Sequence, residues 1–488
     1  MDIKSIIKNL INKTLFKLGI FLNIHPISKF EIELFKFKSL KKKKNLDYKT
    51  QKKIFSNIKL LPGPEIIKEW EEIVIEWENC NPEVFKRLEK FYLSREQYLA
   101  KMGFRNINID FIDKSIFTGS FGMPFHFQVY QEAKQLNFHK ANTLSLIDKK
   151  IKKYPKKWSI TNNTLFNYVK NFFQIIDDKK LITNFEPLDK FLSTPINLAI
   201  PINKKYLMVE IAKNIVNTER YRKNITIPFL NLSESDQKES KKLLKNLGIN
   251  IENEWFVTVH AREPGWAEKS FVKTEFFRNA NIEDYNLSID HIINSGGKVV
   301  RVGDKSMSKV KEKDGFIDYA HSKFKTEKLD VILAAKSKFC IASSSGFFSV
   351  ACMFDVPIIL TNTSHSIVYY RLKKNDFYVP SILKDKKTNK YLKLEKMMFP
   401  PYSMVNYNVE KKYKEWNLEY SKNSPEDILF ATEEMIERLD KNDFNNLKPL
   451  QKKAKTIIEL KQNIYSSENI SAYGVFPEKF LAKHKDLI

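Results

Sequence analysis

Cysteine is scarce in this sequence, which has only three in 488 residues. Their number is odd and their spacing matches no metal-binding module, so the sequence gives no sign of a disulfide framework or a zinc site. Cys340 and Cys352 fall in apolar runs, which is typical of reduced core residues. We therefore expect a cytoplasmic protein folded around an apolar core.

Long apolar runs and the common metal and phosphate motifs are also absent. No run reaches the roughly 18 residues that a membrane-spanning helix needs, and no secretory signal is recognisable. Neither a Walker pattern nor H-E-x-x-H occurs, and no two carboxylates have metal-binding spacing. The sequence therefore predicts no spanning helix, and a site that needs no metal ion or other cofactor.

The net charge of +25 is concentrated at the two ends of the chain. Residues 1–60 carry +11 and residues 441–488 carry +4, which leaves +10 on the 380 residues between them. Lys far outnumbers Arg, and aromatic and basic residues do not interleave as they do in proteins that stack nucleic-acid bases. We therefore expect no nucleic-acid partner.

Residues 1–60 are predicted to form a basic amphipathic arm. Apolar side chains recur there at helical spacing, lysines fall on the opposite side, and a run of four lysines follows. This pattern is typical of proteins that lie on an anionic membrane surface, and it predicts peripheral association through residues 1–45 with the inner face of the cytoplasmic membrane. The alternative is an ordinary surface helix and a solvated run of charge. The lysines concerned are Lys8, Lys13, Lys17 and Lys41 to Lys44.

Breaks in the pattern divide the rest of the chain. The sequence LPGP at Leu61 to Pro64 interrupts any helix or strand, and helical periodicity follows it. Further on, short apolar runs alternate with helical patterns, which predicts the α/β fold class with parallel sheets. The predicted segments are a helical segment (61–112), a first αβ domain (113–235), a second αβ domain (236–405), and C-terminal helices with a tail (406–488).

The first αβ domain begins with a glycine loop. Ile116 and Phe117 are predicted to be a strand that leads into the sequence TGSFG, followed by a helix to about Leu136 and a strand from Asn142 to Ile147. Glycines at a strand-to-helix turn allow backbone N–H groups to approach a ligand, although a plain tight turn has the same pattern. The candidate ligand-binding residues of this loop are Gly119, Ser120 and Gly122.

The stretch from Trp255 to Gly346 contains three apolar runs that each end in polar residues. Phe256 to Val259 is followed by a histidine and an arginine, Lys298 to Val302 by a glycine and an aspartate, and Phe339 to Ala342 by three serines and a glycine. Parallel sheets bind ligands outside the carboxyl ends of their strands. We therefore expect these polar residues to meet at one sheet edge and to suit a nucleotide or a diphosphate.

The side chains at each strand end are suited to binding a phosphate group, and each also has an alternative, purely structural role. Arg262 offers a planar fork of donors that matches phosphate oxygens, and His260 can donate to a phosphate or a sugar hydroxyl. The alternative is a surface arginine and a core histidine with all its hydrogen bonds made. The serine loop precedes an apolar helix, so its hydroxyls and N–H groups form either an anion site or a simple N-cap. The loop consists of Ser343, Ser344, Ser345 and Gly346.

Further candidates lie on the neighbouring strands. Gly303 and Asp304 suit a ribose or a base, or form a capping turn. Arg301, which ends the same apolar run, is a candidate donor-binding residue. Asp318 and His321 lie in a short extended segment, where the histidine is a base, a nucleotide contact or a structural partner.

An ordered series of sequence pieces resembles a family of bacterial glycosyltransferases. The resemblance extends from about Ile225 to Met398 and includes GINIENEWFVTVHAREPGW, GGKVVRVGDKSM, GFIDYAHS and FCIASSSGFFSVACMFDVPIILTN. The family is distantly similar to fucosyltransferase-like enzymes, which hold the donor diphosphate with an H-x-R strand end and need no metal. The resemblance implies a GT-B-like architecture, in which two Rossmann-like domains face a cleft.

The same resemblance implies roles for the strand-end residues. Arg262 holds the donor β-phosphate, His260 assists it, and Ser343 to Gly346 cradle the pyrophosphate. The donor then binds to the C-terminal domain and the acceptor to the N-terminal one.

We predict from this that the protein is a glycosyltransferase. It moves a sugar from a nucleotide-sugar to a glycan or lipid-linked acceptor of the cell surface, with inversion and without a metal. The acceptor hydroxyl needs a general base. Glu263 is the nearest carboxylate in sequence, and an Asp or Glu of the N-terminal domain is an equal candidate. The alternatives are a non-catalytic nucleotide- or polyanion-binding protein and a basic nucleic-acid-binding protein.

Overall fold

The computed structural model describes the greater part of the chain after residue 63. The predicted basic arm lies outside the described residues, so its amphipathic helix and its membrane contact stay predictions. The described residues are 64–101, 109–146, 160–176, 193–266, 276–363, 366–405, 409–461, 464–466, 468 and 470–488. Within them, no helix is long and apolar enough to cross a membrane.

A six-stranded parallel sheet forms the centre of the C-terminal half, with strand order β12-β11-β10-β7-β8-β9. Its strands are short apolar runs, buried on both faces, as is usual in parallel sheets covered by helices. The three strands predicted between Trp255 and Gly346 are confirmed, and they lie side by side. The bounds are β7 (Phe256–His260), β8 (Lys298–Arg301), β9 (Phe316–Ile317), β10 (Cys340–Ser343), β11 (Ile358–Thr363) and β12 (Phe377–Pro380).

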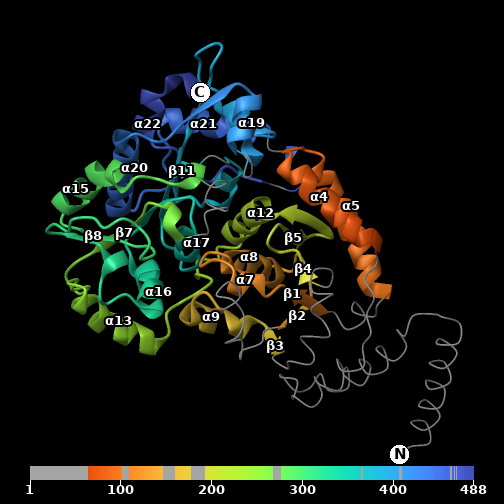
Figure 1. Cartoon of the computed structure of the whole chain (residues 1–488), viewed down its shortest axis with the longest axis horizontal. Helices are drawn as coiled ribbons and strands as arrows, with labels where there is room; N and C mark the ends of the chain where they lie inside the picture. Colours follow the sequence, from red (N-terminus) through yellow and green to blue (C-terminus); the bar gives the residue numbers. More distant parts are fainter. Residues whose placement is uncertain are drawn as a thin grey trace, which may run out of the picture.

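Helices pack against this sheet and place its polar strand ends (Figure 1). Helix α20 packs on α15 and on strands β11 and β12, whereas α16 packs on α13 and α17. The side chains of Ser233 and Ser424 cap α13 and α20, and the predicted helix between Ser233 and Gly248 is confirmed. The bounds are α13 (Glu234–Asn246), α15 (Asn286–Asn294), α16 (Glu327–Lys336), α17 (Gly346–Met353) and α20 (Pro425–Lys441).

A second, separate parallel sheet lies in the N-terminal half, with strand order β3-β2-β1-β4. The antiparallel hairpin β5–β6 leads from it into helix α12. The strands are β1 (Ile109–Ile112), β2 (Asn142–Leu146), β3 (Gln174–Ile176), β4 (Ser193–Thr194), β5 (Ala199–Ile202) and β6 (Lys205–Met208). The helices are α7 (Ser115–Thr118), α8 (Pro124–Gln135), α9 (Asn163–Val169) and α12 (Val209–Arg222).

One predicted strand of this half is wrong. Ile116 and Phe117 lie in helix α7, and the strand before the glycine loop is β1, which ends at Ile112. The side chain of Asp113 accepts a hydrogen bond from the backbone N–H of Ser115 at 2.7 Å, which starts a helical turn instead of extending the strand. Phe117 still reaches the core, where its ring stacks on Phe173. The helix and the strand predicted after the loop are confirmed as α8 and β2.

The two N-terminal helices and the C-terminal tail cover this framework. Helix α5 packs on α4 and on strand β6, at the outer edge of the molecule in Figure 1. The tail returns to both halves, because Ser471 bonds to Asn214 of α12 while Val475 pairs with Phe377 of β12. Because the tail contacts both halves, these contacts do not divide the chain into separate parts, and the domain boundaries stay a prediction. The helices and strands are α4 (Pro64–Glu78), α5 (Val84–Lys101), α18 (Leu394–Met397), α19 (Val409–Glu415), α21 (Pro449–Glu459), α22 (Glu478–Lys483), β13 (Ile382–Asp385) and β14 (Leu418–Ser421).

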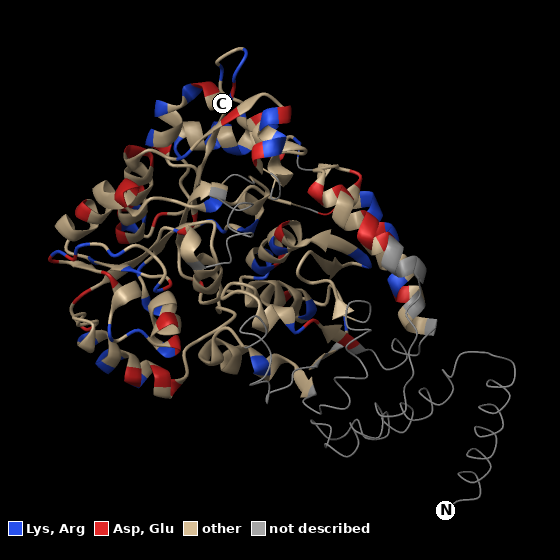
Figure 2. Ribbon diagram, in the orientation of Figure 1, with Lys and Arg blue, Asp and Glu red and all other residues tan. Residues whose placement is uncertain are grey.

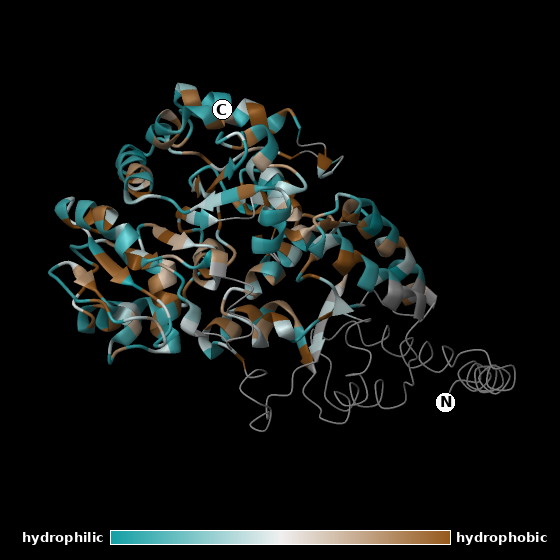
Figure 3. Ribbon diagram, turned by 45° about the horizontal axis from the view of Figure 1, so that its top comes forward, coloured by the Kyte–Doolittle hydropathy of each residue, from teal (hydrophilic) through white to brown (hydrophobic). Residues whose placement is uncertain are grey.

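Apolar residues lie along the strands and the inner sides of the helices (Figure 3), and both signs of charge are interspersed on the outer helices (Figure 2). All three cysteines are buried free thiols, which confirms the expectation of reduced core residues. The short 3-10 helices are η2 (Lys170–Phe172), η4 (Pro264–Trp266), η5 (Phe276–Arg278), η6 (Ile282–Tyr285), η7 (Tyr319–His321), η8 (Ser366–Arg371), η9 (Tyr402–Met404) and η11 (Lys485–Leu487).

Candidate functional site

The carboxyl ends of β7 and β10 lie next to each other and bring the predicted histidine, arginine and serines together. Ala342 of β10 pairs with His260 of β7. The backbone N–H of Arg262 donates to Ser343 Oγ at 3.0 Å, and that hydroxyl donates to the His260 carbonyl at 3.5 Å. The two strand ends are therefore joined directly. We call His260, Arg262 and Ser343–Gly346 the serine-loop cluster.

The Arg262 side chain is buried and oriented by a residue that the sequence did not indicate. It is 5% exposed, and its guanidinium donates to Asn279 Oδ1 at 2.6 Å. The neighbouring Arg278 donates through Nε to the Ser344 carbonyl at 2.9 Å. Arg278 ends η5 and Asn279 follows it, and no motif joins this segment to the strand ends. A second arginine therefore contacts the serine loop.

His260 is a neutral histidine with an unused buried nitrogen. Among the described residues, its Nδ1 has no hydrogen-bond partner and is shielded from solvent. Burial lowers the pKa of His260 to about 4, and the positive charges of Arg262, Arg301 and Lys325 contribute to the same shift. Lys325 is a further cation near the site that the sequence did not indicate. The cationic surroundings favour an anion at this place, and the neutral ring can donate one hydrogen bond to it.

The N-terminus of α17 carries the second unused polar atom. Ser345 is the N-cap residue with extended backbone, but its side chain makes no capping hydrogen bond. Its Oγ is buried and has no partner among the described residues. An unsatisfied buried hydroxyl costs about 1–3 kcal/mol, and the first N–H groups of a helix attract negative charge. A bound anion would satisfy both the hydroxyl and the helix end.

The glycine loop of the N-terminal half touches the serine loop. A Cβ added to Gly122 would lie 2.5 Å from Gly346 Cα and 2.7 Å from its carbonyl oxygen, so the two backbones are in direct contact. The rings of Phe121 and Phe347 flank this contact, with centroids 6.2 Å apart. Two loops more than 200 residues apart in sequence therefore meet at one point.

The other two candidates of this loop, Gly119 and Ser120, use their carbonyl oxygens in hydrogen bonds that hold the loop. The Gly119 carbonyl accepts a hydrogen bond from Thr161 Oγ1 at 3.0 Å, and the Ser120 carbonyl accepts one from the Met123 N–H at 3.0 Å. Gly119 is exposed and Ser120 is half-buried. Of the three residues predicted for the acceptor side, the structure places Gly122 against the serine loop.

Four other candidates form a separate chain of ion pairs, which we call the ion-pair cluster. Arg301 is fully buried and donates to Asp318 at 3.1 Å and to Glu263 at 2.6 Å. His321 Nδ1 contacts the other Asp318 oxygen at 2.9 Å. The cluster consists of Glu263, Arg301, Asp318 and His321.

The contacts of this cluster bear on the prediction that Glu263, the carboxylate nearest to Arg262 in sequence, is the general base. Its Oε1 accepts hydrogen bonds from Arg301 and from the Ser308 hydroxyl, and its Oε2 accepts one from the Ser308 N–H at 2.8 Å. A base needs a free carboxylate oxygen that faces the substrate. The structure therefore favours a structural role for Glu263 as the partner of Arg301.

Gly303 and Asp304 form a turn after β8. Gly303 has φ of +154°, a region that favours glycine, and an added Cβ would collide with the Met307 side chain. The Asp304 carboxylate accepts a hydrogen bond from the Ser306 N–H at 2.9 Å. Burial alone would raise the pKa of Asp304, but the hydrogen bonds from Ser306 outweigh it and lower that pKa. These contacts match the capping turn that was the alternative to ribose binding.

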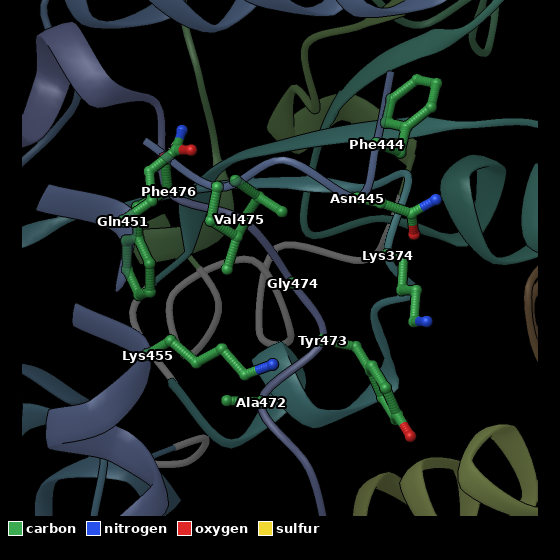
Figure 4. A pocket seen from close by; sticks show the side chains of 11 residues that line it. Lys374, Phe444, Asn445, Gln451, Lys455, Ala472, Tyr473, Gly474, Val475 and Phe476 are labelled. Atoms are coloured by element: carbon green, nitrogen blue, oxygen red, sulfur yellow. Dashed lines mark hydrogen bonds between the residues drawn. The ribbon is translucent and has the colours of Figure 1, made fainter. Parts of the chain in front are cut away.

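Two other features bear on ligand binding, namely groups of possible metal ligands and a cavity under the C-terminal tail. Among the described residues, no three His, Cys, Asp or Glu side chains gather closely enough to hold a metal ion. A cavity of about 130 Å³ lies under the C-terminal tail, between Lys374, Lys455 and Tyr473 (Figure 4). Ligand pockets usually measure about 300–1,000 Å³. This cavity is too small for a nucleotide, and its lining shares no residue with the serine-loop cluster.

Comparison with known proteins gives only distant similarity. No family model and no curated protein matches the sequence. The structure is similar to a family 9 glycosyl transferase from Veillonella parvula, at 12% identity and a TM-score of 0.36 over 68% of this chain and 98% of that one. It is similar to E. coli heptosyltransferase WaaC, solved with ADP, at 13% identity and a TM-score of 0.25 over 63% and 97%.

A third similar structure is the iron-containing dodecameric glycosyltransferase TibC from enterotoxigenic E. coli. The identity is 12% and the TM-score 0.26, over 52% of this chain and 57% of that one. A likeness with TM-scores this low says nothing about activity.

Proposed function

We propose that this protein is a glycosyltransferase that takes a sugar from a nucleotide-sugar donor. The acceptor is a glycan or lipid-linked molecule of the cell surface, and the reaction inverts the anomeric centre without a metal ion. The observation that carries the proposal is the serine-loop cluster. It combines a buried arginine, a neutral histidine and an uncapped helix N-terminus around unused polar atoms.

The cluster suits the leaving diphosphate of such a donor. Arg262 holds two phosphate oxygens, Ser345 Oγ and the first N–H groups of α17 bind the pyrophosphate, and His260 donates to it. Negative charge grows on the leaving oxygen as the bond to the sugar breaks, and fixed donors stabilise that charge. Arg262, Arg278 and Lys325 supply the positive charge that a divalent ion supplies in other enzymes.

The remaining parts of the donor and the acceptor extend from this point. We propose that the turn of Gly303 and Asp304, together with His321, contacts the ribose and the base, while Asp304 stays bound to the Ser306 N–H and His321 Nδ1 to Asp318. The acceptor binds on the side of the glycine loop, Gly119 to Gly122. We propose a GT-B-like arrangement, in which each parallel sheet belongs to one Rossmann-like domain and the substrates lie between them. The basic arm of residues 1–45 would hold the enzyme on an anionic membrane surface.

Nucleotide binding tests the proposal first. ADP, GDP, UDP and CDP are added to the protein in the presence of EDTA, and the unfolding temperature is measured. A nucleotide at 100 times its Kd should raise the free energy of unfolding by about 2.7 kcal/mol. Nucleotide-sugars of the stabilising base are then supplied, and release of the free nucleotide is followed.

The outcomes separate the alternatives. Turnover that continues in EDTA supports a metal-independent transferase. Stabilisation without turnover with any donor would indicate a non-catalytic nucleotide-binding protein. Stabilisation by none of the four nucleotides would refute the assignment of the serine-loop cluster as a donor site.

A further inference from the structure

His126 is a titratable side chain that follows the glycine loop and that the sequence analysis did not single out. It lies in the first turn of α8, four residues after Gly122, whose backbone touches Gly346 of the serine loop. Helix α8 also packs directly on α17. His126 therefore approaches the serine-loop cluster from the opposite half of the molecule.

His126 is the partly exposed residue of the first turns of α8. Residues 124, 125 and 127–133 are all buried, whereas His126 is partly exposed. Helix α8 is exposed again at its C-terminal end, where residue 134 is partly exposed and residue 135 is exposed. His126 follows the glycine loop, whose Gly122 touches Gly346 of the serine loop.

The hydrogen bond of the ring fixes its tautomer. His126 Nδ1 lies 3.1 Å from the Met123 carbonyl oxygen, which can only accept, so Nδ1 carries the proton. In the neutral ring Nε2 then has a free lone pair. Among the described residues, none forms a hydrogen bond with Nε2. The ring is held in the form that can accept a proton from outside the protein.

The surroundings keep this histidine neutral and place it at the junction of the two halves. Burial lowers the pKa of His126 to about 3, and the positive charge of Arg371 contributes to the shift. Arg371 comes from η8, after strand β11 of the six-stranded sheet, and its guanidinium lies 5.0 Å from the Phe125 ring centre. Glu210 of α12 binds Arg371 at 2.6 Å, and the second oxygen of Glu210 is buried without a partner among the described residues. A diphosphate bound nearby would oppose the arginine charge and make the ring more basic.

We propose, resting on the proposed glycosyl transfer, that His126 is the general base of the reaction. Its Nε2 takes the proton of the acceptor hydroxyl as the oxygen forms a bond to the anomeric carbon. The bond from that carbon to the β-phosphate oxygen breaks at the same time, and its electron pair stays on the leaving nucleoside diphosphate. The imidazolium then returns its proton to water.

His126→Asn tests this role without removing the fold contact. The Asn amide nitrogen takes the place of Nδ1 and keeps the donation to Met123, while no atom replaces Nε2. Hydrolysis of the nucleotide-sugar that stabilises the protein is the assay, with water in place of the acceptor. A general base contributes about 10²–10⁴-fold, so the hydrolysis rate should fall by that factor while nucleotide stabilisation stays unchanged. Added imidazole should restore part of the rate to His126→Ala.

His139→Asn is the matched control, because His139 follows the other end of α8 and its Nε2 bonds to the Tyr130 carbonyl. Its hydrolysis rate should stay near the wild-type value. A His126→Asn rate within threefold of wild type, or an His126→Ala loss that imidazole does not restore, overturns the assignment of His126 alone. A wild-type protein that binds and hydrolyses no nucleotide-sugar overturns the proposed function and the base with it.

Discussion

Two polar clusters lie at the same edge of the six-stranded sheet, and they differ in how their hydrogen bonds are used. In the ion-pair cluster, Arg301 is held by two carboxylates and both oxygens of Glu263 accept bonds, so that Arg301 Nε alone is buried without a partner among the described residues. In the serine-loop cluster, His260 Nδ1 and Ser345 Oγ are buried without partners among the described residues. A buried polar group is normally satisfied, so we expect the first cluster to stabilise the fold and the second to bind a ligand.

The largest expected effect tests the structural side of this comparison. Arg301→Met leaves Glu263 and Asp318 without their shared partner in a buried place. Breaking a buried ion pair by removing one partner should lower the free energy of unfolding by about 3–5 kcal/mol, as measured by urea denaturation. Lys313→Met, which removes an exposed pair with Asp290, is the control and should change it by less than about 0.5 kcal/mol. Equal effects of the two variants would contradict the structural role.

Arg262→Lys tests the functional side. The lysine keeps the charge but offers a single hydrated point in place of a planar fork, so it cannot hold two phosphate oxygens and Asn279 together. Loss of one such donor costs about 3 kcal/mol in the transition state, or roughly a hundredfold in kcat. Because Arg262 is buried, unfolding is measured beside turnover.

The control is Arg222→Lys, which alters an exposed arginine paired with Glu219 and should leave kcat unchanged. Near-normal kcat in Arg262→Lys would show that the donor phosphate binds elsewhere.

Gly122→Ala tests the contact between the two loops. The added Cβ meets the Gly346 backbone, which cannot rotate away as a side chain can. Such overpacking should cost about 1–3 kcal/mol of stability. Nucleotide affinity should fall as well, because the serine loop shifts. Ser120→Ala, two residues away, should change neither quantity, and an unaffected Gly122→Ala would mean that the loops do not touch in solution.

The sequence was sufficient to predict strands β7, β8 and β10. Each of them is a short apolar run followed by polar residues, so its position and its polar end are local signals. Ile116 and Phe117 were misassigned because an apolar pair fits a strand or a helix, and the deciding bond comes from Asp113.

Contacts between residues far apart in the sequence could not be predicted from local sequence patterns. Asn279 and Arg278 reach the site from another part of the chain, and Glu263 is next to Arg262 in sequence but is bound to Arg301 in space. The roles predicted for Arg262 and Glu263 stay predictions.

Ser345→Ala should give the smallest effect and the clearest separation of binding from folding. The hydroxyl is buried without a partner, so its removal takes away a desolvated group and no hydrogen bond of the free protein. The free energy of unfolding should stay the same or rise slightly. With a nucleotide bound, the variant lacks one hydrogen bond, worth about 0.5–1.5 kcal/mol, so the Kd should rise roughly two- to tenfold. Calorimetric titration with the stabilising nucleotide measures this Kd.

Ser343→Ala is the contrast, because Ser343 joins Arg262 to His260 and its loss should reduce stability even without a ligand. If Ser345→Ala instead destabilises the free protein and leaves the Kd unchanged, the serine loop is an N-cap and the contrast between the two clusters fails.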